Sequence, residues 1–229
     1  MRELVRRTVP PSKSALVVDV GCGTGGNIAA LAGEYKCVGV DPSREAVDFA
    51  RRRFREVEFI CGEAPRALEP FKDHARLILL MDVLEHIRDD REFFSQVVAT
   101  IKTGTRLLIT VPADESLWSE HDLSFGHFRR YDLSSLRALW ADLPVTTIMA
   151  SYYNARLYPI IKLIRFITRR RGRALGRAGT DFTLLAAPVN RALLNVFAGE
   201  AKVLAKLQEG TRTRGYTYGV GLIAVLRRE

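Results

Sequence analysis

Cysteine, histidine and long apolar runs are scarce in this 229-residue chain. The three cysteines, Cys22, Cys37 and Cys61, have no C-x-x-C spacing and no nearby histidine cluster. This excludes a zinc-ligand pattern and a disulfide framework, so we expect no metal site and a reducing, cytoplasmic compartment. The charged segment 1–7 is not followed by an apolar core of the length that a signal peptide needs, and export is not expected.

Charge is unevenly distributed along the chain. Residues 1–150 hold 20 Lys and Arg against 22 Asp and Glu, whereas residues 151–229 hold 15 against 4, and the net charge is +9. Within residues 152–177, Lys162 and Arg165 interrupt an apolar stretch well short of the ~20 residues of a membrane span. A basic amphipathic helix of this kind is typical of contact with an anionic membrane surface or a protein partner, including a second copy in a homodimer. Packing on the protein core with solvated arginines is the alternative.

The segment Leu16–Asn27 combines an apolar run, an acid and closely spaced glycines. It predicts a buried strand, a tight turn and a helix whose free N–H groups face a ligand. Gly21, Gly23 and Gly26 also satisfy the G-x-G-x-x-G pattern of dinucleotide-binding folds. Asp19 distinguishes the two cases, because a carboxylate here gains nothing from a pyrophosphate but pairs with an ammonium group. The pattern therefore favours a nucleoside with a charged amino-acid tail over NAD.

The string D-V-G-C-G-T-G at 19–25 resembles the first motif of class I S-adenosyl-L-methionine (SAM)-dependent methyltransferases. The string D-V-L-E-H at 82–86 looks like the signature of the small-molecule branch related to ubiquinone-biosynthesis enzymes. The resemblance implies SAM as cofactor, with Asp41 on the ribose and Glu63 near the adenine amine, although Asp is commoner than Glu there. The residues that it places around SAM are Asp19, Gly21, Cys22, Gly23, Gly25, Asn27, Asp41, Pro42, Glu63, Ala64 and Met81.

Alternating apolar and helical segments predict an α/β fold. Five strands are expected, at 16–20, 37–40, 57–60, 77–81 and 106–111, and the intervening helices make a parallel sheet the natural arrangement. A sixth strand near 145–149 and a last strand near 220–226 complete a seven-stranded, Rossmann-like, doubly wound sheet. The resemblance implies that the last strand is antiparallel. The acids at the strand ends would then converge at one edge.

About 65 residues separate the last two predicted strands, where the family has a short loop. They contain the basic helix and a second helix expected at about 188–208. We therefore expect three parts: a SAM-binding core at 1–150, a helical basic insertion that caps the acceptor side at 151–218, and the last core strand at 219–229.

The loop after the fifth strand is dense in His, Asp, Arg and Tyr, which favours an acceptor site there. Its segments resemble the S-L-W-S-x-x-D and G-H-x-R-R-Y segments of methyltransferases associated with bacterial lipid and surface-glycan pathways. An oxygen acceptor must lose a proton, so we select His86, His121, His127 and Tyr131 as candidate catalytic residues. The candidate acceptor-binding residues are Trp118, Asp122, Arg129 and Arg130. Each of these side chains could instead satisfy a loop carbonyl or a neighbouring acid.

We accordingly predict a SAM-dependent methyltransferase that methylates a small, lipid-linked or sugar acceptor at oxygen. Two alternatives remain. The basic C-terminal third is compatible with a nucleic-acid methyltransferase, but the chain after 81 lacks the N/D-P-P-Y motif that holds a flipped base, and a nucleic-acid partner is not expected. The second alternative is a noncatalytic adaptor that keeps the fold for binding.

Overall fold

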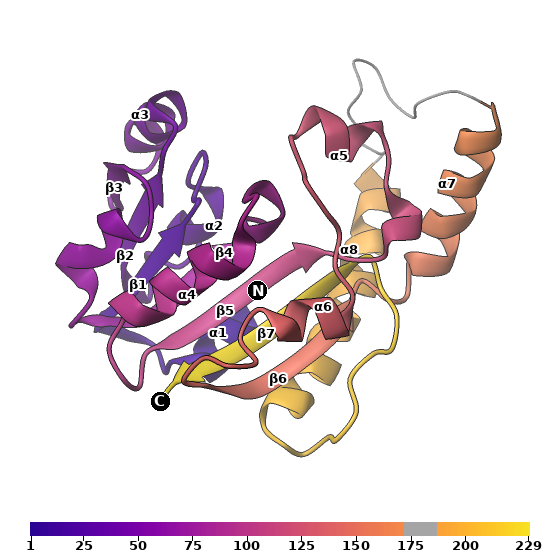
Figure 1. Cartoon of the computed structure of the whole chain (residues 1–229). Helices are drawn as coiled ribbons and strands as arrows, with labels where there is room; N and C mark the ends of the chain where they lie inside the picture. Colours follow the sequence, from indigo (N-terminus) through magenta and orange to yellow (C-terminus); the bar gives the residue numbers. More distant parts are fainter. Residues whose placement is uncertain (172–186) are drawn as a thin grey trace.

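The computed structural model describes residues 1–171 and 187–229, and seven strands in this part of the chain form one sheet in the order β3-β2-β1-β4-β5-β7-β6 (Figure 1). β7 is antiparallel to both of its neighbours, and the remaining pairs are parallel. The predicted fold class is confirmed. The strands are β1 Ser12–Val20, β2 Tyr35–Asp41, β3 Glu58–Cys61, β4 Ala75–Met81, β5 Arg106–Pro112, β6 Val145–Tyr153 and β7 Gly221–Arg228.

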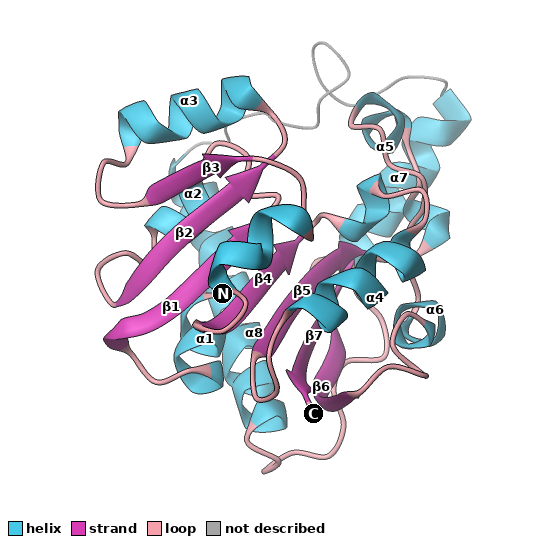
Figure 2. Cartoon of the chain, turned by 60° about the vertical axis from the view of Figure 1, so that its left-hand side comes forward, coloured by secondary structure: helices cyan, strands magenta, loops and turns pink. Residues whose placement is uncertain are grey.

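Helices cover both faces of the sheet (Figure 2). Apolar residues of α1, α2, α3 and α8 pack into one core cluster, and those of α4 and α6 into the other. The helices are α1 Arg2–Thr8, α2 Gly26–Ala29, α3 Arg44–Arg53, α4 Asp90–Thr100, α5 Glu120–Ser124, α6 Leu133–Ala138, α7 Tyr158–Arg171 and α8 Ala187–Gln208, with 3₁₀ helices η1 Arg66–Phe71, η2 Leu84–His86 and η3 Glu115–Leu117.

The side chains of β1 explain why this strand lies at the centre of the fold. Leu16 and Val18 pack into one cluster and Val17 into the other, as the two-residue repeat of a strand requires when both faces are covered. Ser43 caps the helix that follows β2, because its hydroxyl accepts a hydrogen bond from the Ala46 N–H.

The predicted insertion divides into two helices with different surroundings. α8 lies on α1, where Gln208 Nε2 donates to Thr8 Oγ1 at 2.7 Å and Leu204 joins the core. α7 instead contacts η3 near the carboxyl ends of the strands, and the Tyr158 hydroxyl donates to Asp114 at 2.5 Å. α7 therefore lies near the carboxyl ends of the strands, whereas α8 covers a face of the sheet (Figure 1). β6 also runs past the expected boundary at 150. Residues 172–177 of the predicted basic helix lie outside the described residues.

Gly25 is a position where the fold requires glycine. Its φ is +80°, and a Cβ there would come within 2.6 Å of the Phe59 ring. We expect Gly25→Ala to lower the free energy of unfolding by about 2–4 kcal/mol, because left-handed strain and overpacking add. Urea denaturation measures this, with Gly33→Ala as the matched control, since a Cβ at Gly33 would meet nothing within 4 Å. Equal midpoints for the two variants would contradict the argument.

Candidate functional site

The site lies at the carboxyl edge of the sheet, where the chain leaves neighbouring strands in opposite directions. β1 is paired with β2 on one side and β4 on the other, which makes their carboxyl ends the topological switch point. A cavity of about 480 Å³ opens there. It is lined by Val20, Gly21, Val40, Asp41, Pro42, Gly62, Glu63, Ala64, Asp82, Val83, His86, Ile87 and Phe93.

Asp41 joins the glycine loop to the end of β2. Its Oδ2 accepts the Gly23 N–H and its Oδ1 accepts the Ser43 N–H, both at 2.8 Å. The N–H groups of Gly21 and Cys22 donate to the Val40 carbonyl at 2.8 and 3.1 Å. Each carboxylate oxygen has two lone pairs, so Asp41 retains acceptor capacity for hydroxyl groups in the cavity. Asp41 therefore both holds the glycine loop in place and lines the cavity.

Asp19 is buried at the end of β1, with 2% of its surface exposed. Burial, together with the nearby negative charge of Asp41, raises the pKa of Asp19 to about 8. The carboxyl is mostly protonated at neutral pH in the ligand-free protein. A bound ammonium group would favour the ionised form and complete an ion pair.

This protonation state predicts a proton release. We expect S-adenosylhomocysteine binding at pH 7 to release about one proton, because the ligand's ammonium ionises a carboxyl whose pKa is about 8. Affinity should accordingly rise as pH increases toward 8. Calorimetry in two buffers of different ionisation enthalpy measures the release, and Asp19→Asn is the control that should abolish it. Unchanged release in that variant would remove Asp19 from the cofactor site.

The remaining predicted cofactor residues surround the same cavity to different degrees. Exposed Glu63 and half-buried Ala64 line it, as do Gly21 and Pro42. Cys22 is buried behind the loop, where burial raises the pKa of its thiol to about 12. Gly25, Asn27 and Met81 lie outside the cavity lining: Gly25 is buried, Asn27 is exposed on α2, and Met81 ends β4.

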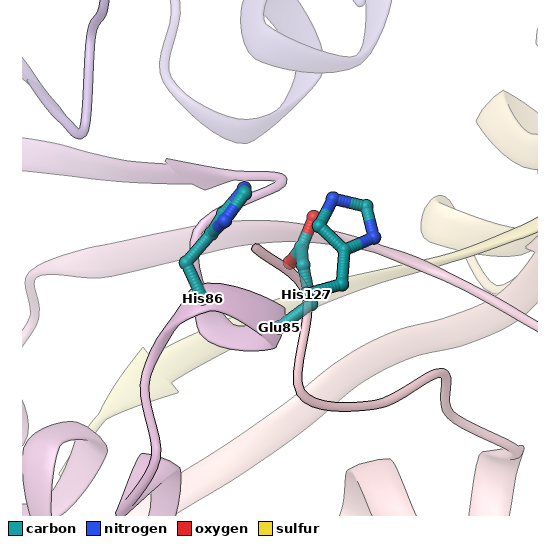
Figure 3. A group of neighbouring side chains, drawn as sticks. All are labelled: Glu85, His86 and His127. Atoms are coloured by element: carbon teal, nitrogen blue, oxygen red, sulfur yellow. The ribbon is translucent and has the colours of Figure 1, made fainter. Parts of the chain in front are cut away.

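A second cavity, of about 310 Å³, adjoins the first and shares Asp82 and His86 with it. The backbone brings two distant segments together here, because the Phe128 N–H donates to the Glu85 carbonyl at 2.8 Å. Figure 3 shows the result: Glu85, His86 and His127 lie side by side. The rings of His86 and His127 meet edge to face, with centroids 4.7 Å apart.

His127 is held by a buried carboxylate. Its Nδ1 lies 3.0 Å from Asp122 Oδ1, and Arg130 contacts both oxygens of Asp122 at 2.8 and 3.0 Å. Asp122 is fully buried, yet the hydrogen bonds and charge of Arg130 keep its pKa below the usual range despite the opposing effect of burial. An ionised Asp122 selects the His127 tautomer with the proton on Nδ1, which leaves Nε2 as an acceptor. The third candidate histidine, His121, also lines this cavity, with its ring against Phe125.

Glu85 has the most unusual surroundings in the cluster. It is fully buried, and neither carboxyl oxygen has a hydrogen-bond partner. Burial and nearby Asp82 raise its pKa to about 8, so it is mainly neutral at pH 7. Glu85, His86 and His127 each offer a donor atom, and these atoms lie within 4.8 Å of one another. Sequence analysis missed this set because Glu85 and His127 are 42 positions apart, although Glu85 belongs to the D-V-L-E-H string.

Tyr131, predicted as a catalytic residue, and Arg129 and Arg130, predicted to bind the acceptor, have their polar groups engaged in internal contacts. The Tyr131 hydroxyl donates to Asp90 at 2.6 Å in the core, and Arg129 pairs with the same carboxylate at 2.6 Å. Arg130 is engaged by Asp122, so neither arginine is an open anion clamp. Trp118 is half-buried at the end of η3 and lies outside the lining of these cavities. Asp122 and Arg130 are therefore positioning residues for His127.

The residues present fit the nucleoside and amino-acid parts of SAM. The first cavity has a carboxylate at the β2 end for vicinal hydroxyls and an apolar wall for a base. The buried Asp19 carboxyl is outside the cavity lining, near the end of β1 and two residues before Gly21, which lines the cavity. The lining of this cavity contains no Lys or Arg side chain that could bind a pyrophosphate. A pyrophosphate there would meet the carboxyl groups of Asp41, Glu63 and Asp82.

The comparisons with known proteins agree with this geometry. A family described as "Methyltransferase domain" matches residues 1–156. Ajmaline N-methyltransferase of Rauvolfia serpentina is 26% identical over 177 residues, covering 68% of this chain and 60% of that protein. The chain therefore spans less than two thirds of that relative's length.

Two solved structures share the fold. One is phosphoethanolamine N-methyltransferase 2 of Haemonchus contortus in complex with SAM: its TM-score is 0.59 at 16% identity, over 99% of this chain and 52% of that one. The other is the [4+2]-cyclase SpnF: its TM-score is 0.60 at 16% identity, over 99% of this chain and 79% of that one. Because one is a methyltransferase and the other a cyclase, the likeness shows the fold alone, and the chemistry must be argued from the site.

Proposed function

The chain belongs to the methyltransferase-domain family, an enzyme family that uses SAM as its cofactor, and on this premise we propose that it methylates a hydroxyl oxygen of a small, lipid-linked or sugar acceptor. The observation that carries the proposal is the pairing of His127 with the buried Asp122 carboxylate beside the cofactor cavity. An amine acceptor can attack as its free base, whereas a hydroxyl must lose a proton during transfer.

The two adjoining cavities supply separate places for the two reactants. When bound, SAM supplies a methyl group already activated on a sulfonium. Asp41, Glu63 and Asp19 would hold the ribose, adenine and amino group. The acceptor hydroxyl would enter the second cavity, next to His127. Positioning at near-attack distance then accounts for much of the rate.

Proton removal is assigned to His127. As the new O–CH₃ bond forms and the S–CH₃ bond breaks, Nε2 takes the hydroxyl proton, and Asp122 stabilises the imidazolium that results. His86 has a different task, since burial and neighbouring His127 lower its pKa and keep the ring neutral. The neutral Glu85 carboxyl can donate a hydrogen bond to the acceptor.

A third cavity supports a polar extension of the acceptor. It has a volume of about 390 Å³, shares Arg130 with the second, and is lined by carboxylate, tyrosine and hydroxyl groups. Tyr158 and Tyr218 lie at its wall with ring centroids 5.4 Å apart. Carboxylates and tyrosine hydroxyls are suited to the hydroxyl groups of a sugar.

The proposal is tested by methyl transfer from isotopically labelled SAM to matched acceptors. Lipid-linked and free sugars are compared with analogues in which the hydroxyl is replaced by hydrogen or by an amine. We expect transfer to the hydroxyl compounds only. Transfer confined to amines would overturn oxygen methylation, and binding of NAD without binding of S-adenosylhomocysteine would overturn the cofactor assignment.

A second candidate gives the cluster a different chemistry, and the partnerless oxygens of Glu85 favour it. Glu85, His86 and His127 could hold a divalent cation, with Asp122 orienting His127 as carboxylates orient metal-bound imidazoles. The cation would then lower the pKa of the acceptor hydroxyl.

Chelation separates these two candidates. With His127 as the base, we expect turnover after exhaustive dialysis against EDTA to stay within about two-fold of the untreated enzyme, since a metal-free base catalyst needs only its imidazole. Metal content is measured on the same samples. Loss of activity that one divalent cation restores would assign the cluster to the metal and contradict the base mechanism.

A further inference from the structure

α7 has its apolar side turned away from the protein. Ile160, Leu163 and Ile167 are three and four positions apart, so they share one face of the helix, and they are 58%, 58% and 38% exposed. A surface helix ordinarily buries such a stripe against the core. This one does not.

The polar side of α7 makes the contact with the protein. Tyr158 and Lys162, one helical turn apart, both reach Asp114, at 2.5 and 3.2 Å, and Lys162 also reaches the Tyr158 hydroxyl at 2.6 Å. At 3.6 residues per turn, this pair lies on the face opposite Leu163 and Ile167. Hydrogen bonds from Tyr158 and Ser116 hold the pKa of Asp114 at about 2 against the effect of burial, so this anchor stays ionised. The orientation of α7 is therefore fixed by specific contacts on its polar side.

The charge of α7 indicates what lies against the outward face. The helix has five cationic residues and no acidic residue, ending in Arg169, Arg170 and Arg171. A second copy presenting the same helix would bring like charges together. An anionic surface would neutralise them and cover the apolar stripe at the same time. Among the described residues, no helix has the length and apolar character of a membrane span.

We propose that α7 docks on an anionic membrane surface, with Ile160, Leu163 and Ile167 entering the boundary between headgroups and acyl chains. Tyr158 and Lys162 on the inner side of the helix line the third cavity. Docking therefore holds the acceptor cavities next to the bilayer, where a lipid-linked acceptor would be presented. The membrane contact goes beyond the methyl-transfer proposal and stands whether the acceptor oxygen or nitrogen is methylated.

The test is co-sedimentation of the full chain with vesicles. Vesicles of equal parts phosphatidylglycerol and phosphatidylcholine are compared with phosphatidylcholine alone, at low and high salt. We expect binding to the anionic vesicles only, weakened by salt because the charge contribution is screened. Leu163→Asp should reduce partitioning about ten-fold or more, since it removes a buried leucine from the contact and adds an anion.

Phe49→Asp is the matched control, because Phe49 is 42% exposed on α3 and distant in the fold from α7. It should bind vesicles as the unmodified chain does. Both variants must retain S-adenosylhomocysteine binding, which shows that they are folded and separates this test from the methyl-transfer proposal. Equal partitioning of Leu163→Asp and the unmodified chain would overturn the proposal. So would failure of the unmodified chain to bind anionic vesicles, or a dimer that Leu163→Asp alone converts to monomer without any change in vesicle binding.

Discussion

His127→Gln is expected to lower kcat for a hydroxyl acceptor by about 10²–10⁴-fold, the usual contribution of a positioned general base. Glutamine keeps a polar side chain of similar length but cannot take up a proton. The second cavity is lined by His127 but the cofactor cavity is not, so affinity for S-adenosylhomocysteine should stay within about two-fold. Initial rates and calorimetry on the same preparations measure the two effects.

The matched control is His74→Gln, because His74 is exposed and precedes β4 at the opposite end of the strands. Its kcat should be unchanged. Exogenous imidazole should partly restore activity to His127→Ala. Full activity in His127→Gln together with loss in His86→Gln would move the base to His86 and contradict the assignment.

Asp122→Asn is a less informative variant than His127→Gln. Arg130 is only 6% exposed and both of its contacts to Asp122 would be weakened, which leaves a buried charge without its counter-ion. Such removal commonly costs about 3–5 kcal/mol in stability, so lost activity could report unfolding. His127 is the better position because Asp122 keeps both of its contacts to Arg130 when His127 is replaced, so no buried charge loses its counter-ion.

Asp41→Ala is expected to weaken binding of S-adenosylhomocysteine by about 100-fold or more. The carboxylate would lose hydrogen bonds to ligand hydroxyls, each of about 1.5–3 kcal/mol for an ionised acceptor. The Gly23 and Ser43 N–H groups, now held at 2.8 Å, would lose their acceptor too, so the loop itself is expected to loosen. Calorimetry measures the affinity and circular dichroism confirms that the sheet is intact.

Asp19→Ala should also weaken binding without unfolding the sheet, through loss of the ion pair with the amino group. Asp48→Ala is the control for both, because Asp48 lies on α3 with 44% of its side chain exposed and pairs with Arg51 at 3.4 Å. If Asp41→Ala and Asp19→Ala both fold and bind as the unmodified chain does, the cofactor site lies elsewhere.

The ends of the strands follow from local signals in the sequence. The strands predicted at 16–20, 37–40 and 77–81 end at the last residue of β1, β2 and β4 or one residue before it. Because these strands are parallel and connected by helices, their carboxyl ends lie at the same edge of the sheet. The glycine loop was also predicted from the sequence, because Gly21, Gly23 and Gly25 adopt positive φ, a conformation that favours glycine.

The sequence predicted the proposed acceptor site only in part. The histidines were selected from composition, but Asp122, expected to bind the acceptor, instead holds His127 and Arg130. Tyr131 was selected as a candidate catalytic residue, and its hydroxyl instead donates a 2.6 Å hydrogen bond to Asp90. Whether Asp122 pairs with His127 and Arg130 depends on how the loop that contains them folds back on η2. The spacing of residues in the sequence does not determine this.

The amino-acid sequence by itself determined the α/β fold, the cofactor edge and the amphipathic, basic character of α7, because strand periodicity, glycine conformation and helix spacing are local properties. Only the tertiary structure decided that Glu85, His86 and His127 meet, and that α7 turns its apolar stripe outward. Those outcomes depend on contacts between distant segments, the Phe128–Glu85 backbone bond and the Tyr158–Asp114 hydrogen bond. The sheet is a consequence of patterns within segments, whereas the acceptor site is a consequence of how the loops and inserted helix pack against it.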